Sequence, residues 1–375
     1  MSFAVWLRRF RLATGVVLMA FVAGHLVNIA LGLVSLETID AGETYFMMPW
    51  QTRAGEALLF ISALVHTFAG LQAILARRSL AMSATDVVQI VLALLVPPLL
   101  LAHIVFTRLT VAYIDGFFAS YGLLLAVLWQ IGPLYGLQQL LVVLIIWTHG
   151  AIGIYSRLVL LPLWRWLGGF VLAIMFAVPV LALLGFVAAG KAVLQRLATD
   201  ANFQQSVHAD LAKIASVQPQ LDRVADAFLI FYGVLAAAVL AALVLRALLG
   251  RRRTVTVAYD DGKVARARPG LTLLEISQLN GIPHAHVCSG RGRCGTCRVE
   301  VEAGAEHLSA MDILERRTLA MMHAGANVRL ACQARLAGGE VRLTRLLPAF
   351  ADASAVREPE EWELVSAMPE PEVAP

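Results

Sequence analysis

Charged side chains are scarce in this sequence. Asp, Glu, Lys and Arg make up 15% of its 375 residues, whereas an ordinary soluble domain carries about 25%. The hydrophobic share is 59%, which indicates a polytopic membrane protein rather than a soluble one. The formal net charge is only +4, so nucleic acid is not an expected partner.

Cysteine is absent from most of the chain, and all four cysteines lie near its C-terminal end. This distribution does not form the disulfide framework of a small secreted protein and favours a reducing compartment. A signal peptide is not expected either. The apolar run after the first arginines is too long for one and lacks a small-residue cleavage site.

Long apolar runs bounded by arginines fill the first 250 residues. A helix needs about 20 such residues to cross a bilayer. Six ranges are predicted to span: 11–35, 54–76, 86–107, 135–157, 164–189 and 226–249. The apolar segment at 111–134 is stopped by Gly132 and Pro133, so we expect it to be interfacial or re-entrant. The segment at 191–225 has a pattern that fits an amphipathic helix outside the cytoplasm.

Arginines gather on one side of the predicted spans. That side carries Arg8, Arg9, Arg11, Arg77, Arg78, Arg157, Arg165 and Arg251–Arg253. The loop at 34–52, on the other side, has acidic residues and no Lys or Arg. By the positive-inside rule, the arginine-rich side is cytoplasmic. We therefore expect a multi-pass protein in a lipid bilayer, with both termini in the cytoplasm.

The composition changes after Arg253. Alternating residues around an Asp-Asp-Gly turn predict a hairpin at 254–270. Helices and strands then alternate, with helices predicted at 271–281 and 312–322 and strands at 298–304, 328–336 and 339–347. The predicted domains are a transmembrane domain at 1–250, an α+β domain at 251–350 and an acidic, proline-rich tail or linker at 351–375.

The four cysteines follow a C-x5-C-x2-C pattern with a distant fourth thiol: Cys288, Cys294, Cys297 and Cys332. A structural zinc site usually has two short C-x2–4-C pairs, and only one exists here. Three thiols on a loop and a fourth from a distant strand suit a [2Fe–2S] cluster. Zinc or a disulfide pair are the alternatives. Arg291 and Arg293 in the loop suit a docking patch for an acidic partner, or simply face solvent.

The stretch CSGRGRCGTC, followed by RLACQ, resembles the ferredoxin superfamily with the β-grasp fold over about residues 254–347. Its first spacing is similar to that of the adrenodoxin-like branch and of ferredoxin domains in bacterial membrane reductases. The resemblance implies that the four cysteines ligate a [2Fe–2S] cluster.

Each of the first four predicted spans contains one histidine: His25, His66, His103 and His149. Ionisable side chains inside a bilayer are costly and usually functional. One such histidine would most simply bond a neighbouring helix, but one in each of four consecutive helices points to two b-type haems with paired imidazoles. At 1.5 Å per residue, depth pairs His66 with His149 toward the cytoplasm and His25 with His103 toward the outside.

This placement is similar to that in the dihaem cytochrome b anchors of succinate dehydrogenases and fumarate reductases, over residues 1–160. The two halves together resemble the N-terminal region of bacterial membrane-bound class III adenylate cyclases. There, a six-helix haem-binding anchor and a [2Fe–2S] ferredoxin precede the cyclase domain. The metal-binding aspartates of a cyclase are absent from this sequence, so the chain itself is not expected to make cyclic AMP.

The sequence therefore predicts a six-helix membrane bundle followed by a β-grasp ferredoxin domain, in a bacterial inner membrane. It is expected to transfer electrons between a cytoplasmic [2Fe–2S] cluster and two haems, with a quinone or a redox protein as partner. The cyclase resemblance implies a redox-sensing regulatory region and a homodimer. Two alternatives stay open: a signalling module without turnover, and a ferredoxin tethered by an inert anchor.

Overall fold

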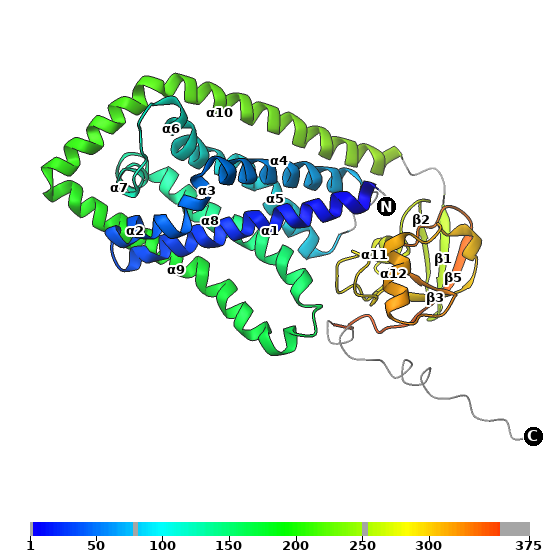
Figure 1. Ribbon diagram of the computed structural model, residues 1–375. Helices are drawn as coiled ribbons and strands as arrows, with labels where there is room; N and C mark the ends of the chain where they lie inside the picture. The colour runs from blue at the N-terminus through cyan, green and yellow to red at the C-terminus, as the bar shows by residue number, and fades with distance from the viewer. Residues whose placement is uncertain (1–2, 78–81, 250–253, 353–375) are drawn as a thin grey trace, which may run out of the picture.

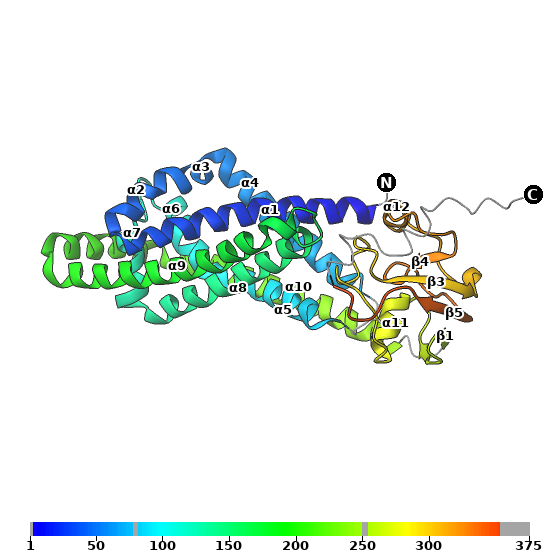
Figure 2. The same ribbon diagram turned by 90° about the horizontal axis from the view of Figure 1, so that it is seen from below.

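A computed structural model describes residues 3–77, 82–249 and 254–352. An elongated helical body carries a small sheet domain at one end, beside the N-terminus of the chain (Figures 1 and 2). The predictions for Arg78, for Arg251–Arg253 and for nearly all of the tail at 351–375 lie outside the described residues.

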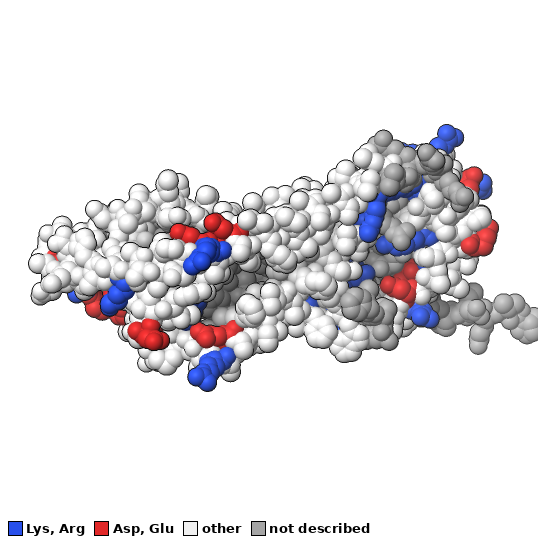
Figure 3. Space-filling view, turned by 90° about the horizontal axis from the view of Figure 1, so that it is seen from above, with Lys and Arg blue, Asp and Glu red and all other residues white. Residues whose placement is uncertain are grey.

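Six helices of the described residues are long and apolar enough to cross a membrane, by length and composition. They lie at the six predicted ranges: α1 (Phe3–Ala30), α4 (Arg53–Leu75), α5 (Ala84–Ile104), α8 (Pro133–Leu158), α9 (Trp164–Thr199) and α10 (Ala201–Leu249). Large apolar side chains face outward, and Phe60, Phe176 and Phe231 are 66%, 73% and 67% exposed. Charged groups gather at the end of the helical body far from the sheet domain, and the stretch between that end and the sheet domain shows almost none (Figure 3).

The segment at 191–225 is helical, as its pattern predicted, but it is not a helix distinct from its neighbours. It extends α9 and α10, which run for 36 and 49 residues and meet at Asp200. The backbone of Asp200 is extended and ends α9, while its carboxylate accepts the N–H of Phe203 at 3.0 Å and begins α10. The mixed polar composition of residues 191–225 is thus that of the ends of α9 and α10, which extend beyond the apolar part of each helix.

Short helices close the end of the body opposite the sheet domain (Figures 1 and 2). They are α2 (Leu36–Phe46), α3 (Met48–Gln51), α6 (Thr110–Tyr113) and α7 (Tyr121–Ala126). The apolar segment Tyr121–Ile131 is too short to span. Its Leu123 and Ala126 are buried in one cluster with Val193 of α9 and Val207 of α10. This part of the 111–134 segment is therefore packed inside the helical end.

Residues 254–352 form five strands and two α-helices: β1 (Val255–Tyr259), β2 (Val264–Ala267), α11 (Leu273–Leu279), β3 (Arg298–Ala303), α12 (Ile313–Met321), β4 (Val328–Leu330) and β5 (Glu340–Arg345). The strand order is β2-β1-β5-β3-β4. β1 is parallel to β5, and the other pairs are antiparallel. A capping box between Thr272 and Glu275 begins α11, whose Leu273 and Ile276 are fully buried in the core.

The predicted strand at 328–336 is too long. β4 ends at Leu330, because the Leu330 carbonyl accepts the N–H groups of both Gln333 and Ala334, at 2.8 and 2.9 Å. The chain turns there, so Cys332 lies in a turn immediately after the strand.

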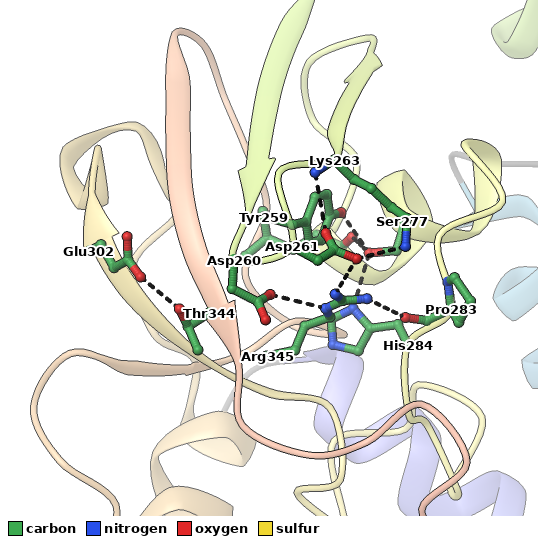
Figure 4. Close-up of polar contacts among 11 residues, drawn as sticks. Tyr259, Asp260, Asp261, Lys263, Ser277, Pro283, His284, Glu302, Thr344 and Arg345 are labelled. Carbon is green, nitrogen blue, oxygen red and sulfur yellow. Dashed lines mark hydrogen bonds and ion pairs between the residues drawn. The ribbon is translucent and has the colours of Figure 1, made fainter.

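Polar side chains fasten the hairpin to the segment that leads into the cysteine loop (Figure 4). Arg345 on β5 contacts Asp260 at 3.3 Å and Asp261 at 2.8 Å. The Ser277 hydroxyl lies 2.7 Å from the Tyr259 hydroxyl and 3.0 Å from Nδ1 of His284. These contacts fix the position of His284, which lies four residues before the first cysteine, Cys288.

Candidate functional site: a cysteine loop and a histidine-lined cavity

The four cysteines are buried and form two pairs. The Cys288 thiol contacts that of Cys294, and the Cys297 thiol contacts that of Cys332. In the part of the chain that is described, no three His, Cys, Asp or Glu side chains converge on one metal ion. A tetrahedral zinc site needs four donors around one point, whereas a two-iron cluster needs two thiolates on each iron. The donor set therefore fits a [2Fe–2S] cluster better than zinc.

The loop backbone curls around the first cysteine. Gly290, Gly292 and Gly295 have φ of 73°, 66° and 65°, a region that glycine adopts without strain. At Gly295 an added Cβ would also overlap the sulfur of Met322. The Cys294 thiol, and then backbone N–H groups of the loop, outweigh burial and lower the pKa of Cys288 to about 5. The loop therefore favours the thiolate at Cys288, the form that binds iron, whereas contacts with neighbouring thiols and burial raise the pKa of Cys294 and of Cys297.

Side chains from outside the loop hold it in place. Thr318 of α12 donates to the Gly292 carbonyl at 2.7 Å. Gln333 donates to the Gly290 carbonyl at 3.1 Å and to the sulfur of Cys332 at 3.2 Å. Such bonds to a ligand sulfur are one means of tuning a cluster potential.

The structure brings the four predicted histidines together in the predicted pairs. The ring centroids of His25 and His103 are 5.9 Å apart, and those of His66 and His149 are 6.1 Å apart. A metal bound between two imidazole nitrogens at about 2 Å each would separate the ring centroids by about 6 Å. Both pairs therefore have the spacing of two imidazoles that share one metal.

Hydrogen bonds to backbone carbonyls orient the imidazoles of the inner pair, His66 and His149. Nδ1 of His66 donates to the Arg11 carbonyl at 3.0 Å, and Nδ1 of His149 donates to the Gln89 carbonyl at 3.2 Å. These bonds leave both Nε2 atoms as acceptors, the usual state of metal-binding histidines. Gly15 packs against His66, and a Cβ there would lie 2.9 Å from its Cε1. Nothing in the local sequence pointed to Gln89 or Gly15, because both meet their histidine across helices.

One cavity of about 2330 Å³ connects the two sets of residues. It is lined by all four histidines, by the loop residues from Ser289 to Arg293, and by Cys332 and Gln333. The cysteine loop therefore closes the end of the histidine-lined space.

Arg291 of the cysteine loop contacts the helical body. The residue that was predicted to dock an acidic partner therefore binds side chains of this same chain. Its Nη2 donates to Oε1 of Gln89 at 2.8 Å and lies 3.8 Å from Oδ1 of Asp86. A second contact joins the domains, since Arg268 donates to the Arg246 carbonyl at 2.7 Å.

Residues 258–337 match the family model of the 2Fe-2S iron-sulfur cluster binding domain. Over 78 residues, the chain is 36% identical to a 2Fe-2S ferredoxin of Pseudomonas aeruginosa, which covers 20% of this chain and 70% of the relative. It is 33% identical over 77 residues to Chlorosome protein I of Chlorobaculum tepidum, covering 20% of this chain and 32% of that protein.

The chain is also 33% identical over 82 residues to one component of the Na(+)-translocating NADH-quinone reductase of Pseudoalteromonas atlantica, covering 21% of this chain and 19% of that protein. The chain thus spans about a third of Chlorosome protein I and about a fifth of the reductase component. Among solved structures, the ISC-like [2Fe-2S] ferredoxin of Pseudomonas putida aligns at 26% identity and a TM-score of 0.23, over 26% of this chain and 94% of that one.

Proposed function

The chain belongs to the [2Fe–2S] ferredoxin family through its sheet domain, and we propose that it carries single electrons between that domain and two b-type haems in its helical body. The four cysteines hold the cluster, His66 and His149 hold the inner haem, and His25 and His103 hold the outer haem. Cluster and haem b each supply a centre that gains or loses one electron. The observation that carries the proposal is the single cavity shared by the cysteine loop and all four histidines.

The helical body lies in a bacterial inner membrane in this proposed function. Six apolar helices with outward-facing phenylalanines support this placement, because an exposed apolar surface of this extent is unfavourable in water. Arg8, Arg11, Arg77 and Arg157 line the end of the cavity where the cysteine loop lies, so that end is cytoplasmic by the positive-inside rule.

The contacts of the histidines support haem rather than helix packing alone. Each inner histidine uses Nδ1 for a backbone carbonyl and keeps Nε2 for the cavity. At the outer pair, Nδ1 of His25 lies 3.2 Å from the Met47 sulfur. A π-helical turn, Val105–Leu109, begins two residues after His103, and such turns are frequent at functional sites.

The electron partner is a quinone or a redox protein in this proposal. An apolar cavity inside a bilayer suits a quinone, and one relative carries NADH-quinone reductase in its name. The resemblance to membrane-bound class III cyclases supports a regulatory use, in which the redox state of a homodimer governs a cyclase domain. A signalling module without turnover would keep every ligand named here and differ only in lacking steady quinol oxidation.

Optical and EPR spectra of the purified chain test the proposal. Dithionite should produce a haem b Soret shift and the EPR signal of a reduced [2Fe–2S] cluster. His66→Ala and His25→Ala should each remove one haem, whereas His208→Ala, at an exposed position on α10, should remove none. If no haem binds but the EPR signal is present, the chain is a tethered ferredoxin. A colourless chain with bound zinc would refute the cluster.

A further inference from the structure

Arginines crowd the end of the cavity nearest the sheet domain. Five of them, here called the arginine cluster, line it: Arg11, Arg77, Arg157, Arg291 and Arg293. Three come from the helical body, and two come from the cysteine loop. The two domains therefore contribute positive charge to the same space.

The charges of the arginine cluster are poorly balanced. Arg11 is repelled by Arg77, Arg157 and Arg291, and Arg293 is repelled by Arg11, Arg157 and Arg291. Asp86 contacts Arg77 at 3.7 Å and Arg291 at 3.8 Å. Within the described residues, no ion pair joins Arg11, Arg157 or Arg293 to a carboxylate.

Two guanidinium nitrogens of the arginine cluster lack a hydrogen-bond partner in the described part of the chain. Nε of Arg157 and Nη1 of Arg293 are buried and make no hydrogen bond among the residues described. Burying an unpaired polar or charged group is costly. Guanidinium groups bind carboxylate or phosphate oxygens through paired hydrogen bonds. The arginine cluster is therefore suited to an anion with at least two negative charges.

The position of the arginine cluster identifies that anion. The carbonyl of Arg11 accepts the Nδ1–H of His66. Arg157 lies on the same helix as His149, about two turns nearer the sheet domain. The arginines therefore surround one edge of the space between the inner histidines. A b-type haem presents two propionate carboxylates at one edge of its ring.

We propose that the arginine cluster binds the two propionates of the haem held by His66 and His149, and that these carboxylates clamp the cysteine loop to the helical body. This rests on the proposed haem at the inner pair. Arg11 and Arg157 hold the carboxylates from the bundle, while Arg291 and Arg293 reach them from the loop. Haem binding then strengthens the docking that Arg291 and Arg268 already provide.

Titration of haem-depleted full-length chain tests the clamp, with haem and haem dimethyl ester as the two probes. The ester lacks free carboxylates, so the wild type should bind it about tenfold or more weakly than haem. Arg157→Gln and Arg293→Gln should weaken haem binding and leave ester binding unchanged. Arg157→Lys should restore part of the loss. The control is Arg165→Gln, at a position that stacks on Trp166 and should have no effect.

Hydrogen exchange of the amides at 288–294 gives a second measurement. Haem should slow their exchange, and the ester should not. Equal binding of haem and ester by the wild type would overturn the clamp while leaving the haem itself in place. Failure of both probes to bind would refute the haem proposal and the clamp together.

Inorganic phosphate distinguishes a free anion from the propionates. Phosphate added to the haem-loaded chain should not change its melting temperature, because the propionates already fill the site. Stabilisation by phosphate that disappears in Arg157→Gln would show that the arginines stay open beside bound haem, and it would overturn the assignment.

Discussion

The backbone carbonyl of Gln89 accepts a hydrogen bond from Nδ1 of His149 at 3.2 Å. The side chain of the same glutamine accepts a bond from Arg291 at 2.8 Å. One residue therefore contacts both the cysteine loop and a proposed haem ligand. We therefore expect that movement of the loop against the helical body affects the orientation of the imidazole through Gln89.

Arg291→Ala should slow electron exchange between the cluster and the inner haem by about tenfold or more. The variant loses a charge-assisted contact to Gln89 and Asp86, and such a loss lowers the docked population by that order. Stopped-flow reduction, followed separately at cluster and haem wavelengths, measures the rate. Arg266→Ala, at an exposed position on β2, is the matched control. An unchanged rate in Arg291→Ala would show that docking does not need this contact.

Gly15→Ala should displace His66 and reduce inner haem binding while leaving the outer haem in place. The new Cβ would lie 2.9 Å from Cε1 of His66, closer than packing allows. Gly169→Ala introduces the same methyl group where nothing lies within 4 Å, and it should keep both haems. Haem content per chain and the spectrum of the reduced protein give the result. Full inner haem occupancy in Gly15→Ala would contradict the proposed position of the ligand.

Glu315→Ala should destabilise the sheet domain by about 3–5 kcal/mol. Glu315 is 1% exposed, pairs with Arg329 at 2.8 Å and accepts the Leu330 N–H at 2.9 Å. Its loss leaves the Arg329 charge buried and loosens the strand that leads to Cys332. Urea unfolding, followed by loss of the cluster absorbance, measures the change. Glu306→Ala removes an exposed carboxylate and should change stability by less than about 0.5 kcal/mol.

Patterns within single segments of the sequence predicted much of this structure, whereas the contacts between helices could not be predicted from them. Depth along each helix, together with the likeness to dihaem anchors, paired His66 with His149, because the rise per residue is fixed. The alternation around Asp260 and Asp261 likewise predicted the β1–β2 hairpin. Gln89 and Gly15 could not be found this way, since their roles depend on which helix faces which. The length of the strand that begins at Val328 was overestimated, because the sequence pattern does not reveal where the turn that contains Cys332 begins.

The stability of the sheet domain should fall as the pH drops from about 6.5 toward 4, because of His284. Burial, and then the charge of Arg345, lower the pKa of this histidine from 6.5 to about 4. In that interval the unfolded chain binds a proton that the folded domain does not, so stability is complete above pH 6.5 and is lost as the pH falls. His284→Asn keeps a partner for Ser277 without titrating. The melting temperature of the cluster absorbance should therefore depend less on pH between 4 and 6.5 in this variant than in the wild type. Identical pH profiles would show that His284 does not carry this dependence.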